Sequence, residues 1–454
     1  MKFEQAFEVV DKAFSANTGR HLNDVELMVL RGSCEGLTYD EMAERSGYGV
    51  NYLKGDAGHK FWKLLSKALG EQVGKRNFQA ALERAKGRFS VAGAELAESA
   101  DALGTEKPDQ EQKSQGDKLA FTFDFYVERP PIEKNCYDEI KRPGALIRIK
   151  APRQMGKTLL MDKIFEYAGR QGYQTVLLNF LQAERDILQN LDKFLRWFCA
   201  NVGRRLQQCY QPEDWDKGLG SNANCTIYFE ECLLANRDYP LVLALDNMDR
   251  VFQYDEQVAI NFLNLLRSWH EEAKIREIWK RLRLVLVLST EVEIPLQLNQ
   301  SAFNVGLAID LPEFTAEQIR DLSKRHEINL DSAQLDRLIS MVGGHPYLVD
   351  KALTYMKYYP NTELERLLQE APTEAGLYDN HLREHLLILH KEPELAAAMK
   401  EVVDAPKAVR LDSEKLFKLE SMGLLRLEEN DVKPRCELYR LYFKERLKGI
   451  RSPS

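Results

Sequence analysis

The sequence predicts an α/β fold in which helices cover both faces of a parallel sheet. A small all-α domain is expected before the sheet, and a helical segment and a winged helix after it. Apolar runs that alternate with amphipathic helices predict the sheet, because strands buried on both faces carry few polar residues. The end of the chain predicts the winged helix, since a helix is followed there by two short strands around a turn and by a final helix. The expected strands of the sheet are residues 145–150, 174–180, 239–246, 282–289 and 305–311.

Changes in periodicity and composition divide the chain into five expected segments. Within the fourth of them, Thr315 and Gln318 form the sequence pattern of a capping box, which predicts a helix that ends near Arg325. The segments are a small helical domain (1–86), a polar and flexible linker (87–119), the sheet domain (120–311), a helical lid (312–380) and the winged-helix domain (381–450). Further helices are expected at 158–167, 185–208, 256–279 and 412–421.

Composition limits the classes of function. The chain has 454 residues, of which 44% are hydrophobic and 29% charged, which is typical of globular domains. Its net charge of −7 excludes nucleic-acid binding over the whole surface, although a local basic patch stays open. Its 7 cysteines form no C-x-x-C pair, which favours reduced thiols over a metal site. Since no signal peptide and no membrane-length apolar run is found, we expect a cytoplasmic protein without a membrane partner.

The stretch KAPRQMGKTLL (150–160) has the pattern of a phosphate-binding loop between a strand and a helix. In G-x-x-x-x-G-K-[ST] loops, backbone N–H groups and the helix N-terminus bind phosphate oxygens. Ala151 replaces the first glycine, which is tolerated if its φ is below zero. We expect ATP or ADP with Mg²⁺, Lys157 at the β- and γ-phosphates and the Thr158 hydroxyl on the metal. The residues expected at the nucleotide are Gln154, Met155, Gly156, Lys157, Thr158 and Leu159.

A second part of the site is expected at the ends of two strands. Asp246 ends an apolar strand after the loop and is the expected carboxylate on the Mg²⁺ side. Asn247 follows, where hydrolytic enzymes of this class carry glutamate, and an amide cannot accept a proton from water. Asp249 is the substitute for a weak base, and Ser289 or Thr290 is the expected sensor of the γ-phosphate. The pattern therefore predicts slow ATP hydrolysis at most.

Eight blocks in order carry a resemblance to a known family. They are FYVERP (125–130), PRQMGKT (152–158), LALDNMDRVF (243–252), STEVEIPL (289–296), FNVGLAIDLPEFT (303–315), GGHPYLV (343–349), APTEAGLY (371–378) and PRCELYRLYF (434–443). With them, residues from about 121 to 450 resemble the AAA-like domain of cyanobacterial STAND-type signalling ATPases. The resemblance implies an ASCE/AAA-like P-loop NTPase domain, followed by the lid and the winged helix.

The same resemblance implies further site residues. Tyr126, Val127 and Arg129 would lie near the base and the phosphates, and Pro346 of the GGHP motif would pack against adenine. The alternative role for GGHP is a helix break and restart, which glycine and proline favour by themselves. Arg435 either reaches the nucleotide or lies at the surface.

Residues from about 1 to 86 resemble the N-terminal helix-turn-helix domain of vWA-MoxR associated proteins. Within them, the stretch LNDVELMVLRGSCEGLTYDEMAERSGY (22–48) also resembles sigma-factor region-four helices. Helices are expected over 24–32 and 37–45, with a recognition helix over 50–65. Its cations would contact the phosphates of duplex DNA, although Gly55 and Gly58 weaken the helix. Docking to a protein is the alternative, because small three-helix modules do both. The residues expected at DNA are Asn51, Lys54, Lys60 and Lys63.

These features predict a STAND-type molecular switch. ATP or ADP would set self-association and the state of the N-terminal module, which acts on DNA or on a protein effector in trans. The alternatives are a mobile-element or DNA-maintenance ATPase that assembles on DNA, and a docking scaffold with permanently bound nucleotide.

Overall fold

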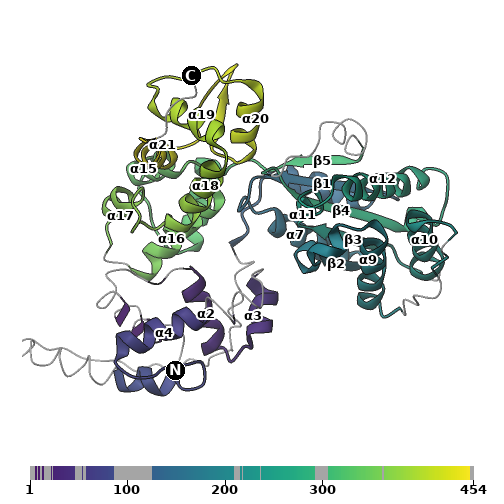
Figure 1. Cartoon of the computed structure of the whole chain (residues 1–454), viewed down its shortest axis with the longest axis horizontal. Coiled ribbons are helices and arrows are strands. Elements are labelled where there is room, and N and C mark those ends of the chain that lie inside the picture. The colour runs from purple at the N-terminus through teal and green to yellow at the C-terminus, as the bar shows by residue number, and fades with distance from the viewer. Residues whose placement is uncertain are drawn as a thin grey trace, which may run out of the picture. The chain divides into compact units, whose positions relative to one another are not determined.

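The structure, a computed structural model, divides into two compact units. These are Met1–Thr122 and Phe123–Ser454, and each is described by itself (Figure 1). The expected linker at 87–119 lies outside the described residues, and the boundaries expected inside the second unit stay predictions. The described residues are 6–7, 9–10, 13–14, 22, 24–46, 54, 58–85, 125–208, 215–216, 218–235, 237–291, 305–359 and 362–449.

In the described part of the first unit, three helices and a further helical segment (78–85) pack around an aromatic core. The Phe61 ring stacks on Phe14 at 5.8 Å, and Trp62 donates a hydrogen bond of 2.8 Å to the Tyr39 hydroxyl. The apolar residues at positions 61, 62, 65 and 69 are buried because they fall on one face of the helix that begins at Gly58. The helices are α2 (Asp24–Cys34), α3 (Tyr39–Ser46) and α4 (Gly58–Leu69), which confirms the helical nature of this domain.

The expected recognition helix ends four residues later than the sequence predicts. Its described part, α4, is Gly58–Leu69, whereas the sequence analysis placed it over 50–65. The helix extends to Leu69 because Leu69 is buried and continues the apolar face begun by Phe61. Residues 50–53 and 55–57, including Asn51, lie outside the described residues.

The second unit contains the expected parallel sheet. All neighbouring strands pair in parallel in the order β2-β3-β4-β1-β5, so β1 lies between β4 and β5. The five strands are β1 (Leu146–Ala151), β2 (Gln174–Asn179), β3 (Leu241–Asp246), β4 (Leu282–Ser289) and β5 (Leu307–Asp310). Because parallel strands share one direction, the residues that follow β1, β3 and β4 meet at one edge of the sheet.

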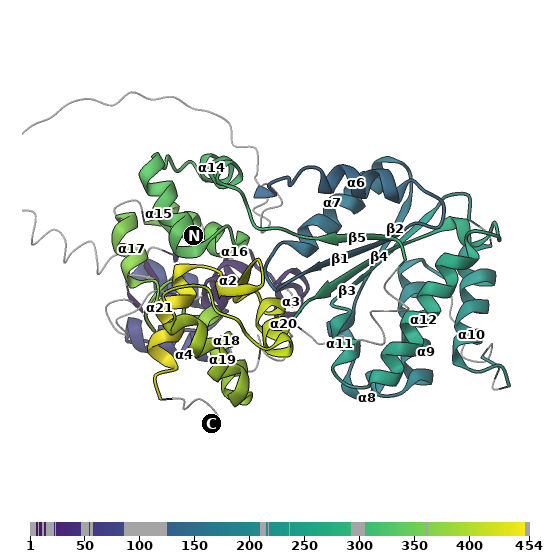
Figure 2. The same ribbon diagram turned by 90° about the horizontal axis from the view of Figure 1, so that it is seen from above.

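Apolar residues alternate between the two faces of the sheet. In β3, Leu241, Leu243 and Leu245 join one core, while Val242 and Ala244 join the other. Helices α6 and α7 cover one face, and α9, α10 and α12 cover the opposite face (Figure 2). The covering helices are α6 (Ile132–Ile140), α7 (Lys157–Arg170), α9 (Leu191–Arg205), α10 (Ser221–Tyr228, continued by a π-helical segment Phe229–Leu234) and α12 (Glu256–Glu272).

Two expected helices are shorter than the sequence predicts. The span 185–208 contains α8 (Arg185–Leu188) and α9, because the Asn190 side chain accepts a hydrogen bond of 3.0 Å from the Lys193 amide and starts a new helix. The helix expected over 256–279 ends at Glu272. The chain then turns back, so that buried Trp279 stacks on Trp269 at 5.0 Å.

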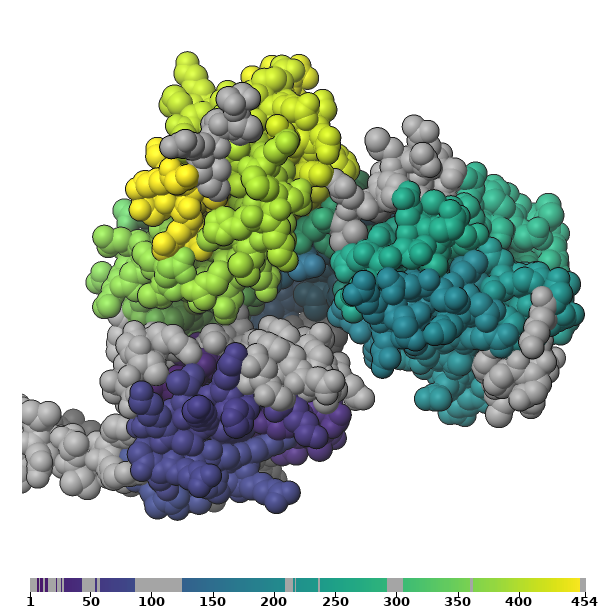
Figure 3. Space-filling model, in the orientation of Figure 1, coloured from purple at the N-terminus to yellow at the C-terminus, as the bar shows by residue number. Residues whose placement is uncertain are grey.

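The helices and the hairpin that follow residue 311 share one hydrophobic core. Their surface is the green to yellow part of Figure 3. Thr315 and Gln318 form the expected capping box at the start of α14. The antiparallel hairpin of β6 and β7 pairs Leu425 with Pro434, as expected for the winged helix. The elements are α14 (Ala316–Arg325), α15 (Ser332–Val342), α16 (Pro346–Tyr358), α17 (Leu364–Glu370), α18 (Asp379–Lys391), α19 (Pro393–Asp404), α20 (Ser413–Ser421), β6 (Leu425–Glu428), β7 (Asp431–Pro434) and α21 (Glu437–Arg446).

In the part of the chain that the structure describes, every helix falls short of the length and apolar character needed to cross a bilayer.

Candidate functional site

The phosphate-loop motif lies between β1 and α7, at the edge where the parallel strands end. Gly156 has a φ of 91° and caps α7, a conformation that favours glycine. A Cβ atom at Gly156 would also lie 2.8 Å from Nη2 of Arg129. Within the described residues no side chain caps the start of α7, so its first N–H groups are suited to an anionic ligand. Ala151 ends β1 as an ordinary strand residue paired with Ser289, which explains why glycine is not needed there.

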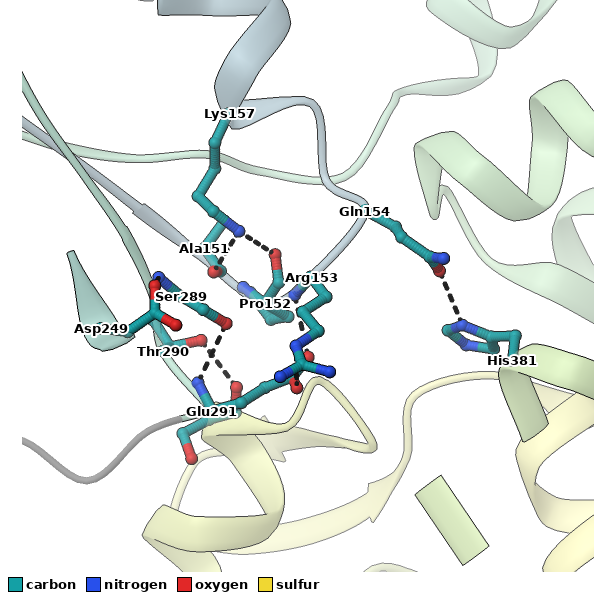
Figure 4. A network of polar contacts seen from close by, with 11 residues as sticks. Ala151, Pro152, Arg153, Gln154, Lys157, Asp249, Ser289, Thr290, Glu291 and His381 are labelled. Carbon is teal, nitrogen blue, oxygen red and sulfur yellow. Dashed lines mark hydrogen bonds and ion pairs between the residues drawn. The ribbon is translucent and has the colours of Figure 1, made fainter. Parts of the chain in front are cut away.

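The side chain of Lys157 folds back over its own loop. Its Nζ donates hydrogen bonds to the carbonyl oxygens of Ala151 at 3.0 Å and Pro152 at 2.7 Å (Figure 4). Burial lowers the pKa of Lys157 to about 8, while Glu291, Asp249 and other nearby carboxylates act in the opposite direction. The ammonium is therefore held at the loop, where an anionic ligand would complete its coordination.

Arg129 brings a second cation to the loop. Its side chain is buried, and burial lowers its pKa. The guanidinium lies over the Phe314 ring at 4.7 Å, and its Nε and Nη1 have no hydrogen-bond partner in the described part of the chain. The Arg129 amide donates to Glu133 at 2.8 Å, and the Tyr126 hydroxyl donates to the same carboxylate oxygen at 2.6 Å. The segment thus places unsatisfied N–H groups beside Gly156, and an anion is the ligand they suit.

The Asp246 carboxylate is buried at the end of β3. Burial raises its pKa to about 6, and one of its oxygens accepts a hydrogen bond of 2.9 Å from the Asn247 amide. Asp162, which the sequence analysis missed, is half-buried on α7. Burial, and then the Asp246 charge, raise its pKa to about 6. The available signal was its spacing of four residues from Thr158, which puts both on one face of the helix.

These oxygen groups fit Mg²⁺, which prefers carboxylate and hydroxyl ligands together with phosphate and water. The Asp246 and Asp162 charges repel each other, and a divalent cation would relieve that repulsion. No group of three or more His, Cys, Asp or Glu side chains within the described ranges is arranged to hold a metal alone. A metal at Thr158 and Asp246 would therefore take its other ligands from phosphate and water.

The backbone conformation at position 247 favours asparagine. Its φ is 56°, in the left-handed region that asparagine adopts more readily than glutamate. Its Nδ2 donates a hydrogen bond of 3.1 Å to Oδ1 of Asn179, at the end of β2. The side chain is thus held toward the neighbouring strand.

Replacing Asn247 with glutamate is expected to lower the free energy of unfolding by about 1–2 kcal/mol. It forces a longer side chain into the left-handed region and removes the bond to Asn179. Urea unfolding measures this cost, and phosphate release by the same variant measures any gain in hydrolysis. Asn247→Gly, which fits the backbone, serves as the control and is expected to lose only the hydrogen bond. An unchanged stability in Asn247→Glu contradicts this account.

Asp249, Ser289 and Thr290 meet at the end of β4 but face different partners (Figure 4). Buried Asp249, the first residue of α11 (Asp249–Phe252), accepts a hydrogen bond of 3.1 Å from the Ser289 amide. The Thr290 hydroxyl donates a bond of 2.6 Å to the Ser421 carbonyl at the end of α20. One oxygen of the expected base is thus engaged with the strand, and the Thr290 hydroxyl is engaged with the winged helix. Their roles in hydrolysis stay predictions.

Glu291 is a site residue that the sequence analysis did not select. One of its carboxylate oxygens accepts a 2.9 Å hydrogen bond from the Arg153 amide, and the other pairs with Arg153 Nε at 3.1 Å. The Glu291 side chain is only 5% exposed, and burial raises its pKa. Its position directly after Ser-Thr at a strand end was the only signal. Through these contacts with Arg153, Glu291 connects the phosphate loop to the segment that follows β4.

The GGHP motif restarts a helix and also touches the site. Pro346 is the buried first residue of α16. The carbonyl oxygen of Gly344 accepts a bond of 2.8 Å from the amide of Phe314, whose ring contacts Arg129. The contact of Pro346 with adenine stays a prediction.

A cavity of about 770 Å³ lies beside the segment expected to bind the base. Tyr126 and Val127 line it together with residues of α6, α7 and α14. Arg435, for which two positions were open, is partly exposed. Its side chain is 18% exposed, and its Nε pairs with Glu313 at 2.7 Å.

The cations expected at DNA are only partly described. Lys54, Lys60 and Lys63 are exposed, which suits phosphate contacts. Asn51 lies outside the described residues.

Two protein-family models match this chain. Residues 115–445 match the model described as an AAA-like domain, and residues 1–85 match the vWA-MoxR associated protein N-terminal HTH. No curated protein matches the chain in sequence.

Solved structures resemble the chain at low sequence identity. The Walker-type ATPase PABY2304 of Pyrococcus abyssi is 12% identical, with a TM-score of 0.45, over 70% of this chain and 95% of its own. Cdc6p of Pyrobaculum aerophilum is 16% identical, with a TM-score of 0.35, over 72% of this chain and 98% of its own. The ORC1 protein of Aeropyrum pernix, solved in complex with DNA, is 14% identical, with a TM-score of 0.34, over 71% and 92%. Such values describe a distant likeness and identify no ligand.

Proposed function

This chain belongs to the AAA-like domain family, and on that premise we propose that it binds ATP or ADP with Mg²⁺ and acts as a slowly hydrolysing STAND-type molecular switch. An AAA-like P-loop domain is joined to an N-terminal helix-turn-helix domain. The nucleotide state of the first domain would set self-association and the activity of the second. Scattered thiols favour a cytoplasmic location.

The observation that carries nucleotide binding is the buried guanidinium of Arg129 beside Gly156, the residue that precedes Lys157. Lys157 is held over the loop by backbone carbonyls, and Arg129 brings unsatisfied N–H groups to the same glycine. Burying unpaired positive charge is costly unless an anion balances it. A polyphosphate at the N-terminus of α7 supplies that charge and also accepts the N–H groups of the helix.

Thr158 and Asp246 are the residues that would hold Mg²⁺. The ion would neutralise charge on the phosphate oxygens. Asp162 would add negative charge behind the ion, because its charge already interacts with that of Asp246. This chain provides a weak water-activating group, since Asn247 is an amide and Asp249 is engaged with Ser289. The chemistry therefore favours prolonged occupancy over rapid turnover.

A switch requires contacts that differ between nucleotide states. Two hydrogen bonds connect the phosphate-loop region to the C-terminal helices, from Thr290 to Ser421 and between Gln154 and His381. Gln154 lies three residues before Lys157, and Thr290 is itself an expected sensor of the γ-phosphate. A phosphate that moves the loop would therefore also strain these two hydrogen bonds. Release of the C-terminal helices would expose surface for self-association or for an effector.

The test is equilibrium binding of ATP, ADP and AMP to the full chain, with and without Mg²⁺. The phosphate site predicts that ATP and ADP bind at least about tenfold more tightly than AMP, because two or more charge-assisted hydrogen bonds are lost with the outer phosphates. Equal affinity for all three nucleotides contradicts the proposal. A nucleotide that copurifies and never exchanges would favour the scaffold alternative.

A second output, binding of duplex DNA, is supported by the helix-turn-helix match and by the exposed Lys60 and Lys63 on α4. Phosphate contacts by lysine release counterions, so affinity falls as salt concentration rises. On this basis the alternative of an ATPase that assembles on DNA stays open, and docking to a protein is the opposing outcome.

Replacing Lys60 and Lys63 with alanine in the full chain is expected to weaken DNA binding and to flatten its salt dependence. Each lost phosphate contact lowers the slope of log affinity against log salt by about 0.9. Fluorescence anisotropy of a labelled duplex from 50 to 200 mM salt, roughly the range in which such slopes are resolved, measures it. The control pair Lys391→Ala and Lys407→Ala, both exposed in the second unit, should leave the slope unchanged. The same slope in both pairs argues for protein docking.

A further inference from the structure

A hydrogen-bonded chain connects the phosphate loop to the last helix of the winged-helix region. Nδ1 of His381, on α18, lies 2.8 Å from Oε1 of Gln154 (Figure 4). Nε2 of the same ring lies 2.7 Å from the hydroxyl of Tyr439, on α21. Gln154 belongs to the loop, so one imidazole touches both the phosphate loop and α21.

The chemistry of the three groups gives this chain a direction. His381 is buried, and burial holds the pKa of its imidazole well below the usual value, so the ring is neutral and carries one proton. A glutamine carbonyl oxygen can only accept, so Nδ1 donates to Gln154 and Nε2 accepts from Tyr439. Tyr439 is 1% exposed, which leaves its hydroxyl no solvent as a replacement partner.

The loop end of the chain is conformationally constrained. Gln154 has a φ of 60°, a left-handed conformation that side chains other than those of glycine and asparagine adopt rarely. Because the Gln154 side chain is exposed, the residue can relax from this backbone conformation unless a contact holds the side chain in place. The hydrogen bond to His381 is such a contact. Gln154, which makes it, lies two residues before Gly156.

We propose that His381 is a positioning residue that holds the phosphate loop through Gln154 and passes the state of the loop to α21 through Tyr439. This rests on the proposed function, since it assigns the element by which that site controls the C-terminal helices. A nucleotide that alters the conformation of the phosphate loop also alters the hydrogen bond between Gln154 and His381. A shift of the imidazole then alters its hydrogen bond to Tyr439. By reciprocity, loss of the Tyr439 hydroxyl changes affinity at the phosphate site.

The experiment is a double-mutant cycle with Gln154→Ala and Tyr439→Phe in the full chain, read out by ADP affinity. Each single variant is expected to weaken ADP binding about fivefold, which is the value of one hydrogen bond. The double variant is expected to be no weaker than either single variant, because both break the same chain. Tyr442→Phe is the matched control, since its hydroxyl lies on the same helix but donates to Glu374 at 3.1 Å. It should leave ADP affinity unchanged and add independently to Gln154→Ala.

Hydrogen exchange of α21 gives a readout that a merely structural contact would not move. ADP is expected to change exchange of Glu437–Arg446 in the wild type and in Tyr442→Phe, and to have no such effect in Gln154→Ala. Two outcomes overturn the proposal. One is a fold loss of ADP affinity in the double variant that equals the product of the two single losses, and the other is hydrogen exchange of α21 that still responds to ADP in Gln154→Ala.

Failure of the proposed function is separable from failure of the relay. If the wild type binds no ADP, the nucleotide site is wrong, and the same cycle is then read by urea unfolding. Non-additive stabilities still support the contact chain through His381, and additive ones reject it.

Discussion

Replacing Lys157 with alanine is expected to weaken ATP binding roughly 100-fold, which corresponds to about 3 kcal/mol. The ammonium is fixed over the loop by the carbonyl oxygens of Ala151 and Pro152, so it reaches a bound phosphate without further ordering. A short apolar side chain removes both the charge and the hydrogen bonds that the β- and γ-phosphates would accept. Isothermal titration of the full chain with ATP and Mg²⁺ measures the loss.

The matched control is Lys193→Ala. Lys193 lies on α9, which covers the opposite face of the sheet, and its ammonium pairs with Asp186 at the surface. This variant is expected to bind ATP as the wild type does. Urea unfolding of both variants separates a lost ligand contact from a lost fold. If Lys157→Ala folds and retains wild-type affinity, the phosphate site is placed wrongly.

Three histidines that are buried together are expected to lower the free energy of unfolding as the pH drops from about 6.5 toward 4, whereas Asp162 and Asp246, whose pKa values burial raises to about 6, act in the opposite direction. The histidines are His345, His381 and His385, and none is more than 6% exposed. Burial lowers the pKa of His345 to about 3 and that of His385 to about 4, and it lowers that of His381 strongly. Positive side chains nearby act in the same direction, namely Arg435 and Lys157 on His345, Arg153 on His385 and Lys351 on His381.

The sign follows from proton binding in the two states. Between pH 6.5 and 4 these imidazoles are neutral in the folded chain and protonated in the unfolded chain. At these three sites the unfolded state therefore binds more protons, and acid favours it. At Asp162 and Asp246 the folded state binds more protons, so the measured slope is the net of the two groups. Each histidine contributes up to about 1.4 kcal/mol per pH unit, so the three together contribute up to about 4 kcal/mol per pH unit. Denaturant unfolding at a series of pH values measures this slope.

His385→Leu isolates one of the three contributions. It is expected to reduce the slope near pH 5 by about 1.4 kcal/mol per pH unit, because leucine takes up no proton on unfolding. Stability at neutral pH should change little, since Nδ1 of His385 has no hydrogen-bond partner among the described residues. His390→Gln is the control, because the exposed His390 on the same helix is hydrated in both states. Equal slopes in the wild type and His385→Leu contradict the assignment.

Local patterns predicted much of the second unit. The apolar runs located all five strands to within one or two residues. The signal is strongest for β3 and β4, which are buried at every position, because a strand buried on both faces is apolar along its length. The capping box at Thr315 and the turn of the β6–β7 hairpin fixed their elements, because their determinants lie within a few residues of sequence. The end of α12 was not predictable in this way, because the chain turns there to bring Trp279 onto Trp269.

The sequence alone determined which residues make the phosphate loop, since Gly156, Lys157 and Thr158 are contiguous and their chemistry is local. Only the tertiary structure decided that Arg129 meets Gly156, that Glu291 holds Arg153, and that His381 joins Gln154 to Tyr439. These partners lie from 27 to 285 residues apart in the sequence, and single-chain periodicity contains no information on such pairs. Burial then sets their charge and hydrogen-bond state, because desolvation depends on the packed surroundings and not on neighbours along the chain.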